Sequence, residues 1–421
     1  DGVRINMSHA SREELEARIK RVREFERSRG KPIAVIVDLR GASIRTGLTE
    51  PVEVSPGSRV VFKPVDKGDG SFIPVPLREF FRAVEPGDEV LMLDGKLALR
   101  VVEASPDVVE ALALSGGVVT SNKAVVVRGK DFDIEPPVPE DLAALKTLEE
   151  FRDDVDYVAL SLIKNGSEVS LMRRVVEEHG IAADVIAKIE TRGAVERFEE
   201  ILSAADYAVI ARGDLALHYG LEYIPRVQRI LAEKALEAGK PVAVATQLLD
   251  SMQNSPTPTR AEVNDVYTTV SLGVDSLWLT NETASGSYPV EAVKWLIKVA
   301  SQAEAFYFAR PSPRSSRDRF AKAVADMAMD LGADIVVYTM TGTLAKRIAK
   351  FRPLRPVYAG TREWKIARKL VLIWGVRPMV VPADGYEAGL EALVKLFGGR
   401  SLVATYGFRG GVHTIKLYLS E

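Results

Sequence analysis

The chain of 421 residues is long enough for two or three domains with a large buried core. Its formal net charge of -2 gives no basic field that would predict binding to nucleic acid or to an anionic membrane. The absence of cysteine excludes disulfides, a thiolate nucleophile and cysteine-ligated zinc. No apolar run reaches the length of a membrane span and the first residues do not resemble a secretory leader, so we expect a cytoplasmic enzyme. Six Asn and four Gln beside 56 basic and 58 acidic residues are typical of a thermophile.

Short apolar, often β-branched runs recur through the first three hundred residues, and amphipathic helical stretches separate most of them. This alternation predicts a (β/α)₈ TIM barrel, an α/β fold whose parallel strands are buried on both faces. A closed barrel of this type needs eight strands, so we expect one N-terminal βα unit to be missing before Asp1. The seven predicted strands are residues 2–6, 33–39, 157–163, 185–190, 207–213, 242–247 and 276–282.

The alternation stops after Leu48 and returns near residue 134. The stretch between is rich in Pro, Gly and Val and has few helical patterns, which predicts an inserted small all-β domain over residues 49–133. The barrel then takes residues 1–48 and 134–310. A linker leads into a C-terminal α/β domain over residues 311–421, with helices expected between its strands at 334–339, 356–361, 376–381, 401–407 and 413–419.

Reactive side chains follow three successive barrel strands. Lys188 and Glu190 lie two apart on one strand and therefore point to the same face. The next strand ends at Gly213 and Asp214, and the one after it at Thr246. Because barrel strands gather their C-terminal ends at one mouth, the two carboxylates predict a Mg²⁺ or Mn²⁺ site, with Lys188 beside it to stabilise developing negative charge. The alternative is a set of ion pairs that only cap the barrel mouth.

The first two strands end in a second polar group, which includes several arginines. Because a guanidinium binds phosphate through two parallel hydrogen bonds, Arg4 and Arg45 are candidates to hold a phosphoryl group between them. The polar residues at these two strand ends are Arg4, Asn6, Ser8, His9, Asp38, Arg40 and Arg45.

The chain closely resembles the pyruvate kinase family over almost its whole length. The motifs that carry the resemblance are RINMSHA, DLRGASIRTG, AKIETRGAV, IARGDLALHYG, KPVAVATQLLDSM, PTRAEVNDV and LTNETASGSYPVEAV. The resemblance implies that the inserted domain is the family's small β-barrel lid and that the chain ends in its C-terminal domain. It also implies transfer of the phosphoryl group of phosphoenolpyruvate to ADP, giving pyruvate and ATP in the last step of glycolysis, by an allosteric homotetramer.

The resemblance implies a role for each matching residue. Lys188 stabilises the transition state, Glu190 and Asp214 bind Mg²⁺ (or Mn²⁺), and Arg4 contacts substrate. Gly213, Asp214 and Thr246 hold the substrate beside Lys188, and Thr246 counts with Lys188 and Arg4 as catalytic. The residues that bind the nucleotide and its phosphates are Asn6, Ser8, His9 and Arg45.

Three sites depart from the family pattern or extend it. A monovalent cation would be held by Asn6, Ser8, Asp38 and the backbone at Leu39, but Leu39 replaces the usual threonine and Ser43 matches neither the potassium-dependent nor the potassium-independent pattern. This favours no strict K⁺ requirement. A lysine that often helps to bind ATP aligns with Glu140. In the C-terminal domain Thr341, Gly342 and Thr343, together with the nearby GFRGGVHT segment, form a candidate anion site for a sugar-phosphate effector of unknown identity; an ordinary helix cap is the alternative.

Two other functions fit parts of the sequence. One is a different Mg²⁺-dependent phosphoenolpyruvate or pyruvate barrel enzyme, such as a lyase or aldolase, which would need no ADP. The other is a catalytically silent ligand sensor.

Overall fold

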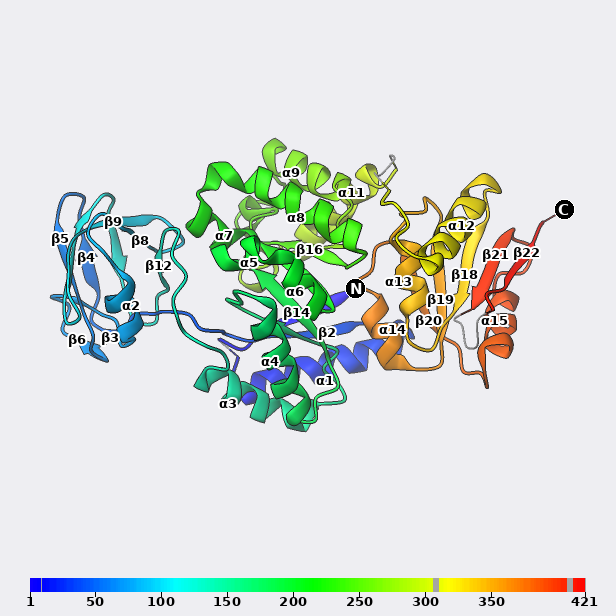
Figure 1. Ribbon diagram of the computed structural model, residues 1–421, viewed down its shortest axis with the longest axis horizontal. Coiled ribbons are helices and arrows are strands. Elements are labelled where there is room, and N and C mark those ends of the chain that lie inside the picture. The colour runs from blue at the N-terminus through cyan, green and yellow to red at the C-terminus, as the bar shows by residue number, and fades with distance from the viewer. Residues whose placement is uncertain (9, 306–309, 407–411, 421) are drawn as a thin grey trace.

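The computed structural model describes residues 1–8, 10–305, 310–406 and 412–420. In Figure 1 a curled parallel sheet and its helices lie in the middle, a β region lies at one end, and an α/β unit with a five-stranded sheet lies at the other. No helix within the described ranges combines the length and the apolar character that crossing a membrane would require.

The seven predicted barrel strands are all present in the central sheet, and every neighbouring pair is parallel. All but the first of these strands end earlier than predicted. The fifth, for example, ends at Ala211, and Arg212 already begins a helix. Within the described residues the first and last strands are the two edges of this sheet. The strands, in sheet order, are β1 (Gly2–Asn6), β2 (Ala34–Asp38), β13 (Tyr157–Leu160), β14 (Asp184–Ile189), β15 (Tyr207–Ala211), β16 (Val242–Ala245) and β17 (Ser276–Trp278).

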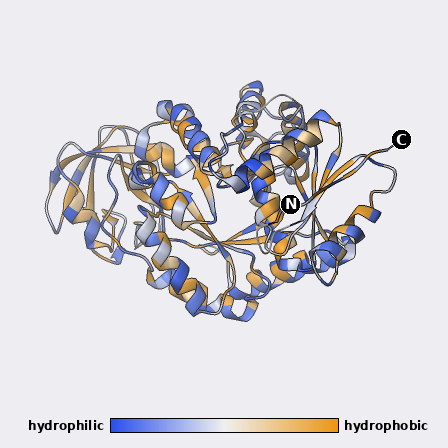
Figure 2. Cartoon of the chain, turned by 45° about the vertical axis from the view of Figure 1, so that its right-hand side comes forward, coloured by the Kyte–Doolittle hydropathy of each residue, from blue (hydrophilic) through white to orange (hydrophobic). Residues whose placement is uncertain are grey.

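Side chains of these strands alternate between two buried clusters. One set, which includes Val35, Val158 and Ile210, packs against the surrounding helices, and these helices turn their hydrophilic faces outward in Figure 2. The helices are α1 (Arg12–Arg29), α3 (Pro139–Leu148), α4 (Gly166–Glu178), α5 (Arg192–Glu196), α6 (Phe198–Ala204), α7 (Arg212–Tyr219), α8 (Ile224–Ala238), α9 (Arg260–Ser271), α10 (Asn281–Ala284) and α11 (Pro289–Ala303), with 3₁₀ turns η1 (Glu149–Phe151), η2 (Leu221–Tyr223) and η3 (Asp250–Gln253).

The inserted region is an all-β unit with a core of its own, built around Phe62, Phe80 and Phe81. Its main sheet has six strands in the order β12-β8-β9-β10-β5-β7, and two short pairs, β11-β4 and β3-β6, complete it. The elements are β3 (Leu48–Thr49), β4 (Val52–Val54), β5 (Arg59–Lys63), β6 (Lys67–Gly68), β7 (Ile73–Pro74), α2 (Arg78–Ala83), β8 (Glu89–Met92), β9 (Leu97–Ala104), β10 (Val109–Ala113), β11 (Gly117–Val119) and β12 (Val125–Val127).

The C-terminal sheet has the order β20-β19-β18-β21-β22, parallel except for its last pair. Helices fill the first three gaps between strands. In the fourth gap the described residues 412–414 hold no helix, and an antiparallel partner needs no helical crossover. The elements are α12 (Ser316–Asp330), β18 (Asp334–Tyr338), α13 (Thr343–Ala349), β19 (Val357–Thr361), α14 (Trp364–Leu370), β20 (Val376–Val380), α15 (Tyr386–Lys395), β21 (Leu402–Tyr406) and β22 (Ile415–Tyr418).

The C-terminal unit closes the end of the barrel at which the strands begin. Barrel-facing side chains such as Ile36 and Ile186 share one cluster with Leu372 and Ile373. At the same end Tyr157 donates a hydrogen bond to the carbonyl oxygen of Lys369 at 2.6 Å. The opposite end of the barrel, where the strands finish, is therefore the end left for chemistry.

We expect Gly389→Ala to lower the free energy of unfolding by about 1–3 kcal/mol, the usual cost of overpacking a core. A Cβ at Gly389 on α15 would lie far inside van der Waals distance of the Tyr338 ring. That ring is fully buried, and its hydroxyl is held by the carbonyl oxygen of Val381 at 2.9 Å.

Denaturant unfolding measures this cost, with Gly398→Ala as the control, because a Cβ there meets nothing closer than 4.0 Å. An unchanged or higher stability of Gly389→Ala would contradict the packing described for α15.

Candidate active site

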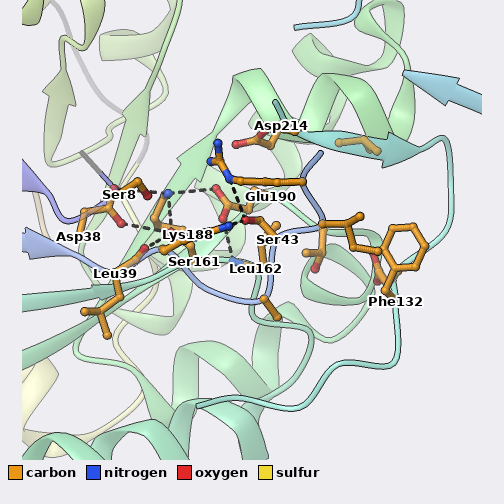
Figure 3. Close-up of a pocket in the computed structure, with 18 of the residues that line it drawn as sticks. Ser8, Asp38, Leu39, Ser43, Phe132, Ser161, Leu162, Lys188, Glu190 and Asp214 are labelled. Atoms are coloured by element: carbon orange, nitrogen blue, oxygen red, sulfur yellow. Dashed lines mark hydrogen bonds and ion pairs between the residues drawn. The ribbon is translucent and has the colours of Figure 1, made fainter. Parts of the chain in front are cut away.

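The strand ends surround a cavity of about 190 Å³ between the barrel mouth and the segment that returns from the β insert (Figure 3). Barrel residues line most of it, and Val125, Val126 and Phe132 contribute from the insert side. Of the residues predicted from sequence, the structure brings to this cavity Arg4, Asn6, Ser8, Asp38, Leu39, Arg45, Lys188, Glu190 and Asp214.

Lys188 occupies the centre of this cluster, near the end of β14. Its Nζ donates to Ser161 Oγ at 2.8 Å and lies 3.4 Å from Asp38 Oδ2 and 3.3 Å from Glu190 Oε2. Burial by itself lowers the pKa of Lys188, but the charges of Asp38 and Glu190 outweigh it and leave the pKa above its ordinary value. Lys188 therefore stays positively charged.

Asp38, at the end of β2, forms ion pairs with two basic side chains, Arg4 and Lys188. Arg4 Nη2 lies 2.5 Å from Asp38 Oδ2, and Ser161 Oγ lies 3.2 Å from Asp38 Oδ1 and 2.8 Å from the carbonyl oxygen of Leu39. Burial would raise the pKa of Asp38, yet Lys188 and Arg4 hold it below its ordinary value. Arg4 is thus an ion-pair partner of Asp38 as well as a cavity residue.

Glu190 and Asp214 form the acidic side of the cavity. Glu190 Oε1 accepts a hydrogen bond from the Leu162 backbone at 2.7 Å, whereas Oε2 is buried without any hydrogen-bond partner. Burial raises the pKa of Glu190 to about 7, and Asp214 and Asp38 add to the rise while Lys188 opposes it. Asp214 stands in the first turn of α7. A buried carboxylate oxygen that accepts no hydrogen bond, and that stands near a second carboxylate with only the ammonium of Lys188 beside it, suits a divalent cation.

The described residues include no cluster of three or more His, Asp or Glu side chains placed to hold a metal. The two carboxylates would therefore supply only part of a coordination shell. Mg²⁺ commonly binds through one or two carboxylates and completes its shell with water and substrate oxygens. The residues present fit that cation better than one that needs a complete protein cage.

Arg40 and Arg45 form the basic side. Both approach Ser43 Oγ, at 3.5 Å and 3.2 Å, and Arg45 also donates to the carbonyl oxygen of Asn122 at 2.9 Å. Burial, followed by the charge of Arg40, lowers the pKa of Arg45. Glu140 lies on α3 and pairs with Arg40 at 3.1 Å.

Gly213 and Thr246 meet each other but are not among the residues that line the cavity. The backbone N–H of Gly213 donates to Thr246 Oγ1 at 2.7 Å. Gly213 precedes Asp214 in the first turn of α7, and Thr246 follows the end of β16.

The remaining predicted residues lie elsewhere. His9 and residues 407–411 of the GFRGGVHT segment are outside the described residues. Thr341, Gly342 and Thr343 sit at the start of α13 in the C-terminal unit. Their amides are already engaged there, Gly342 with Thr339 Oγ1 at 2.9 Å and Thr343 with Thr341 Oγ1 at 3.5 Å.

Several cavity residues were missed from the sequence. Ser161 lies near the end of the predicted strand 157–163, so the strand-end pattern that identified Lys188 also applied to it. Asp131 and His218 carry no such signal, because their contact, 3.7 Å from His218 Nδ1 to Asp131 Oδ1, joins the return segment to α7. Lys164, which donates to the carbonyl oxygen of Ile134 at 2.6 Å, likewise needs the fold to be recognised.

Comparison with known proteins matches both halves of the chain to one family. The protein-family model described as "Pyruvate kinase, barrel domain" matches residues 1–293. The family model described as "Pyruvate kinase, alpha/beta domain" matches residues 318–407. Pyruvate kinases from Pyrobaculum aerophilum and Thermotoga maritima are 54% and 34% identical, over 100% and 98% of this chain and 91% of each relative.

Solved structures agree with these matches. The crystal structure of pyruvate kinase from Pyrobaculum aerophilum superposes with a TM-score of 0.94 at 53% identity and covers 99% of this chain and 93% of that one. A pyruvate kinase from Cryptosporidium parvum gives a TM-score of 0.89 at 27% identity, over 99% of this chain and 90% of that one. With its barrel and its C-terminal sheet both matched, the chain belongs to the pyruvate kinase family, whose members are phosphotransferases.

Proposed function

We propose that the barrel-mouth cavity is where this chain transfers the phosphoryl group of phosphoenolpyruvate to ADP. The bond between phosphorus and the enol oxygen breaks, and a terminal phosphate oxygen of ADP forms the new bond to phosphorus, giving ATP. The enolate left behind takes a proton from solvent at its methylene carbon and becomes pyruvate. The observation that carries the proposal is the charged Lys188, held between Asp38 and Glu190 and facing the cavity.

Lys188 is assigned the role of stabilising negative charge. Phosphoryl transfer spreads charge over the moving group and the enol oxygen, and a fixed ammonium lowers the energy of that state. A lysine whose pKa is raised is a poor base at neutral pH. Its contacts therefore favour electrostatic stabilisation over proton removal.

Glu190 and Asp214 are assigned to a divalent cation, Mg²⁺ or Mn²⁺. Such a cation, when bound, draws phosphate and carboxylate oxygens together and offsets their charge. Glu190 Oε2, which accepts no hydrogen bond and has only the ion pair with Lys188, supports this assignment, while the Leu162 N–H keeps the carboxylate oriented.

The other residues are assigned to positioning of the substrates. Arg4 contacts phosphoenolpyruvate, and Gly213 and Thr246, which are hydrogen-bonded to each other, hold its carboxylate region. Asn6, Ser8, His9 and Arg45 serve ADP and its phosphates. Because phosphoryl transfer needs mainly alignment and charge stabilisation, this set is sufficient without a covalent intermediate.

The chain is proposed to have no strict K⁺ requirement, although the family generally uses the ion. Three of the four residues that would bind K⁺ already use their oxygen atoms in contacts within the protein. Asp38 is paired with Arg4 and Lys188, the Leu39 carbonyl oxygen accepts from Ser161, and Asn6 Oδ1 accepts from the Ser8 amide at 3.0 Å.

We also propose the division into a barrel (1–48 and 134–310), a lid (49–133) and a C-terminal domain (311–421), a homotetrameric assembly and a cytoplasmic location. Separate sheets support the division, and the insert also has a core of its own. Exposed Val290, Val293 and Ile297 on α11 offer an apolar face that supports assembly. An anionic effector at Thr341–Thr343 remains a proposal of the same kind.

A lyase or aldolase is the alternative that the family matches do not support. ADP-dependent release of pyruvate from phosphoenolpyruvate separates the two activities, because a lyase needs no nucleotide. Binding of phosphoenolpyruvate and metal without turnover would instead identify a sensor.

We expect Lys188→Met to lower kcat on the order of 10²- to 10³-fold, the range seen when a single group that stabilises transition-state charge is removed. Pyruvate release measures kcat, and Mn²⁺ binding measured separately should persist. The exposed Lys146→Met is the control and should keep wild-type turnover. Near-wild-type kcat in Lys188→Met would refute the role assigned to Lys188.

We expect Glu190→Gln to raise the Mg²⁺ concentration for half-maximal activity by at least about tenfold, because the amide loses the negative charge but keeps an acceptor for Leu162. Titration of activity with Mg²⁺ measures this half-maximal concentration. Glu282→Gln is the matched control, a buried carboxylate that accepts from the backbones of Leu249 and Thr280 away from the cavity. Equal metal dependence in the two variants would move the metal site elsewhere.

We expect the turnover rate to be the same, within experimental error, in K⁺ and in tetramethylammonium buffers of equal ionic strength. The ammonium of Lys188 and the guanidinium of Arg4 already neutralise Asp38. Pyruvate release in potassium-free buffer measures the effect, and a steep loss of activity there would contradict the proposal.

A further inference from the structure

Arg212 is a buried arginine beside the site that the proposed mechanism does not use. It is the first residue of α7, and its side chain is 8% exposed. The guanidinium reaches across to the end of β16, where Nη2 donates to the carbonyl oxygens of Thr246 at 2.9 Å and Gln247 at 2.7 Å. Nε donates a third hydrogen bond, to Thr246 O at 3.2 Å.

The backbone that Arg212 holds is in an unfavourable conformation. Thr246 has φ of 73° and Gln247 has φ of 51°, so two consecutive non-glycine residues are left-handed. A β-branched residue such as threonine rarely adopts that region. Such backbone persists where the surrounding contacts over-determine it, and these cases cluster at functional sites.

The side chain of Thr246 is fixed by the same junction. Its Oγ1 accepts from the Gly213 amide at 2.7 Å and donates to the carbonyl oxygen of Ala245 at 2.6 Å. Gly213 follows Arg212 and precedes Asp214 in the chain. The Arg212 side chain and the Gly213 backbone therefore join Thr246 to the turn that carries Asp214.

Asp265 on α9 orients the guanidinium from the other side. Both of its carboxylate oxygens accept from Arg212 Nη1, at 2.9 Å and 2.8 Å. A lysine carries one compact charge at the end of a flexible stem and does not reproduce this planar set of donors. The arrangement therefore depends on arginine at position 212.

We propose that Arg212 is a positioning residue for phosphoryl transfer, which sets the place of Thr246 relative to Asp214 through the two carbonyl oxygens it binds. The inference rests on the role proposed for Thr246. It predicts that Arg212 influences turnover through Thr246 and not by a separate route.

A double-mutant cycle of Arg212→Lys and Thr246→Ala tests this dependence. We expect Arg212→Lys alone to lower kcat on the order of 10²-fold, as a displacement of about 1 Å does, with little change in KM for ADP. In the Thr246→Ala background the same substitution should change kcat by no more than about twofold. Asp265→Asn, a milder change, should show the same dependence on Thr246 with a smaller loss.

Arg352→Lys is the matched control. Arg352 is also buried, has φ of 45°, pairs with Asp275 and donates to the carbonyl oxygen of Gly273 at 2.6 Å, but it lies beneath the opposite end of the barrel. The substitution Arg352→Lys should lower the melting temperature and leave kcat unchanged.

Two results overturn the inference in distinguishable ways. An equal loss of kcat from Arg212→Lys in both backgrounds, or no loss at all, refutes the positioning role and leaves the role of Thr246 standing. Wild-type kcat in Thr246→Ala refutes the role of Thr246, and the inference fails with it.

Discussion

The buried charge of Lys188 is the constraint on which the barrel mouth depends. An ammonium removed from water needs opposite charges close by, and Asp38 and Glu190, each 1% exposed, supply them. If all five groups are ionised, Arg4 and Lys188 carry two positive charges, and Asp38, Glu190 and Asp214 carry three negative ones. Burial is the main reason that the pKa of Glu190 rises to about 7, and the surplus negative charge of Asp214 and Asp38 adds to the rise. A bound cation would offset that surplus charge.

The strand that carries Lys188 is fixed at both ends. Its first residue, Asp184, lies 2.5 Å from the Nζ of Lys369 in the C-terminal unit. Tyr157 on the neighbouring β13 is bound to the carbonyl oxygen of the same residue. An apolar cluster fills the barrel between these contacts and the mouth. The packing of this cluster therefore holds the C-terminal ends of the strands in place. The charged side chains of β14 at the mouth therefore need no loop to position them.

The strands and the gathering of their ends were predictable from sequence, because β-branched runs in alternation with helices leave few other folds. The pairing of side chains at the mouth was not predictable. Arg4 was expected to bind phosphate, yet its nearest partner is Asp38, thirty-four residues away along the chain. Thr246 follows the strand-end rule but is bound to the Gly213 amide and does not line the cavity. Such choices depend on rotamers and on strand register, neither of which a single sequence specifies.

The basic side chains of the cavity interact with its acidic ones, and this bears on what the cavity can bind. Arg40 and Arg45 both approach Ser43 Oγ, and Arg40 pairs with Glu140, which is half exposed. Burial and the charge of Arg40 lower the pKa of Arg45, and the charge of Asp214 opposes them only in part. A phosphate beside Arg45 would offset both the burial and the like charge. In the proposed mechanism, a cation at Glu190 and Asp214 and nucleotide phosphates at Arg45 would together hold the transferring group near Lys188.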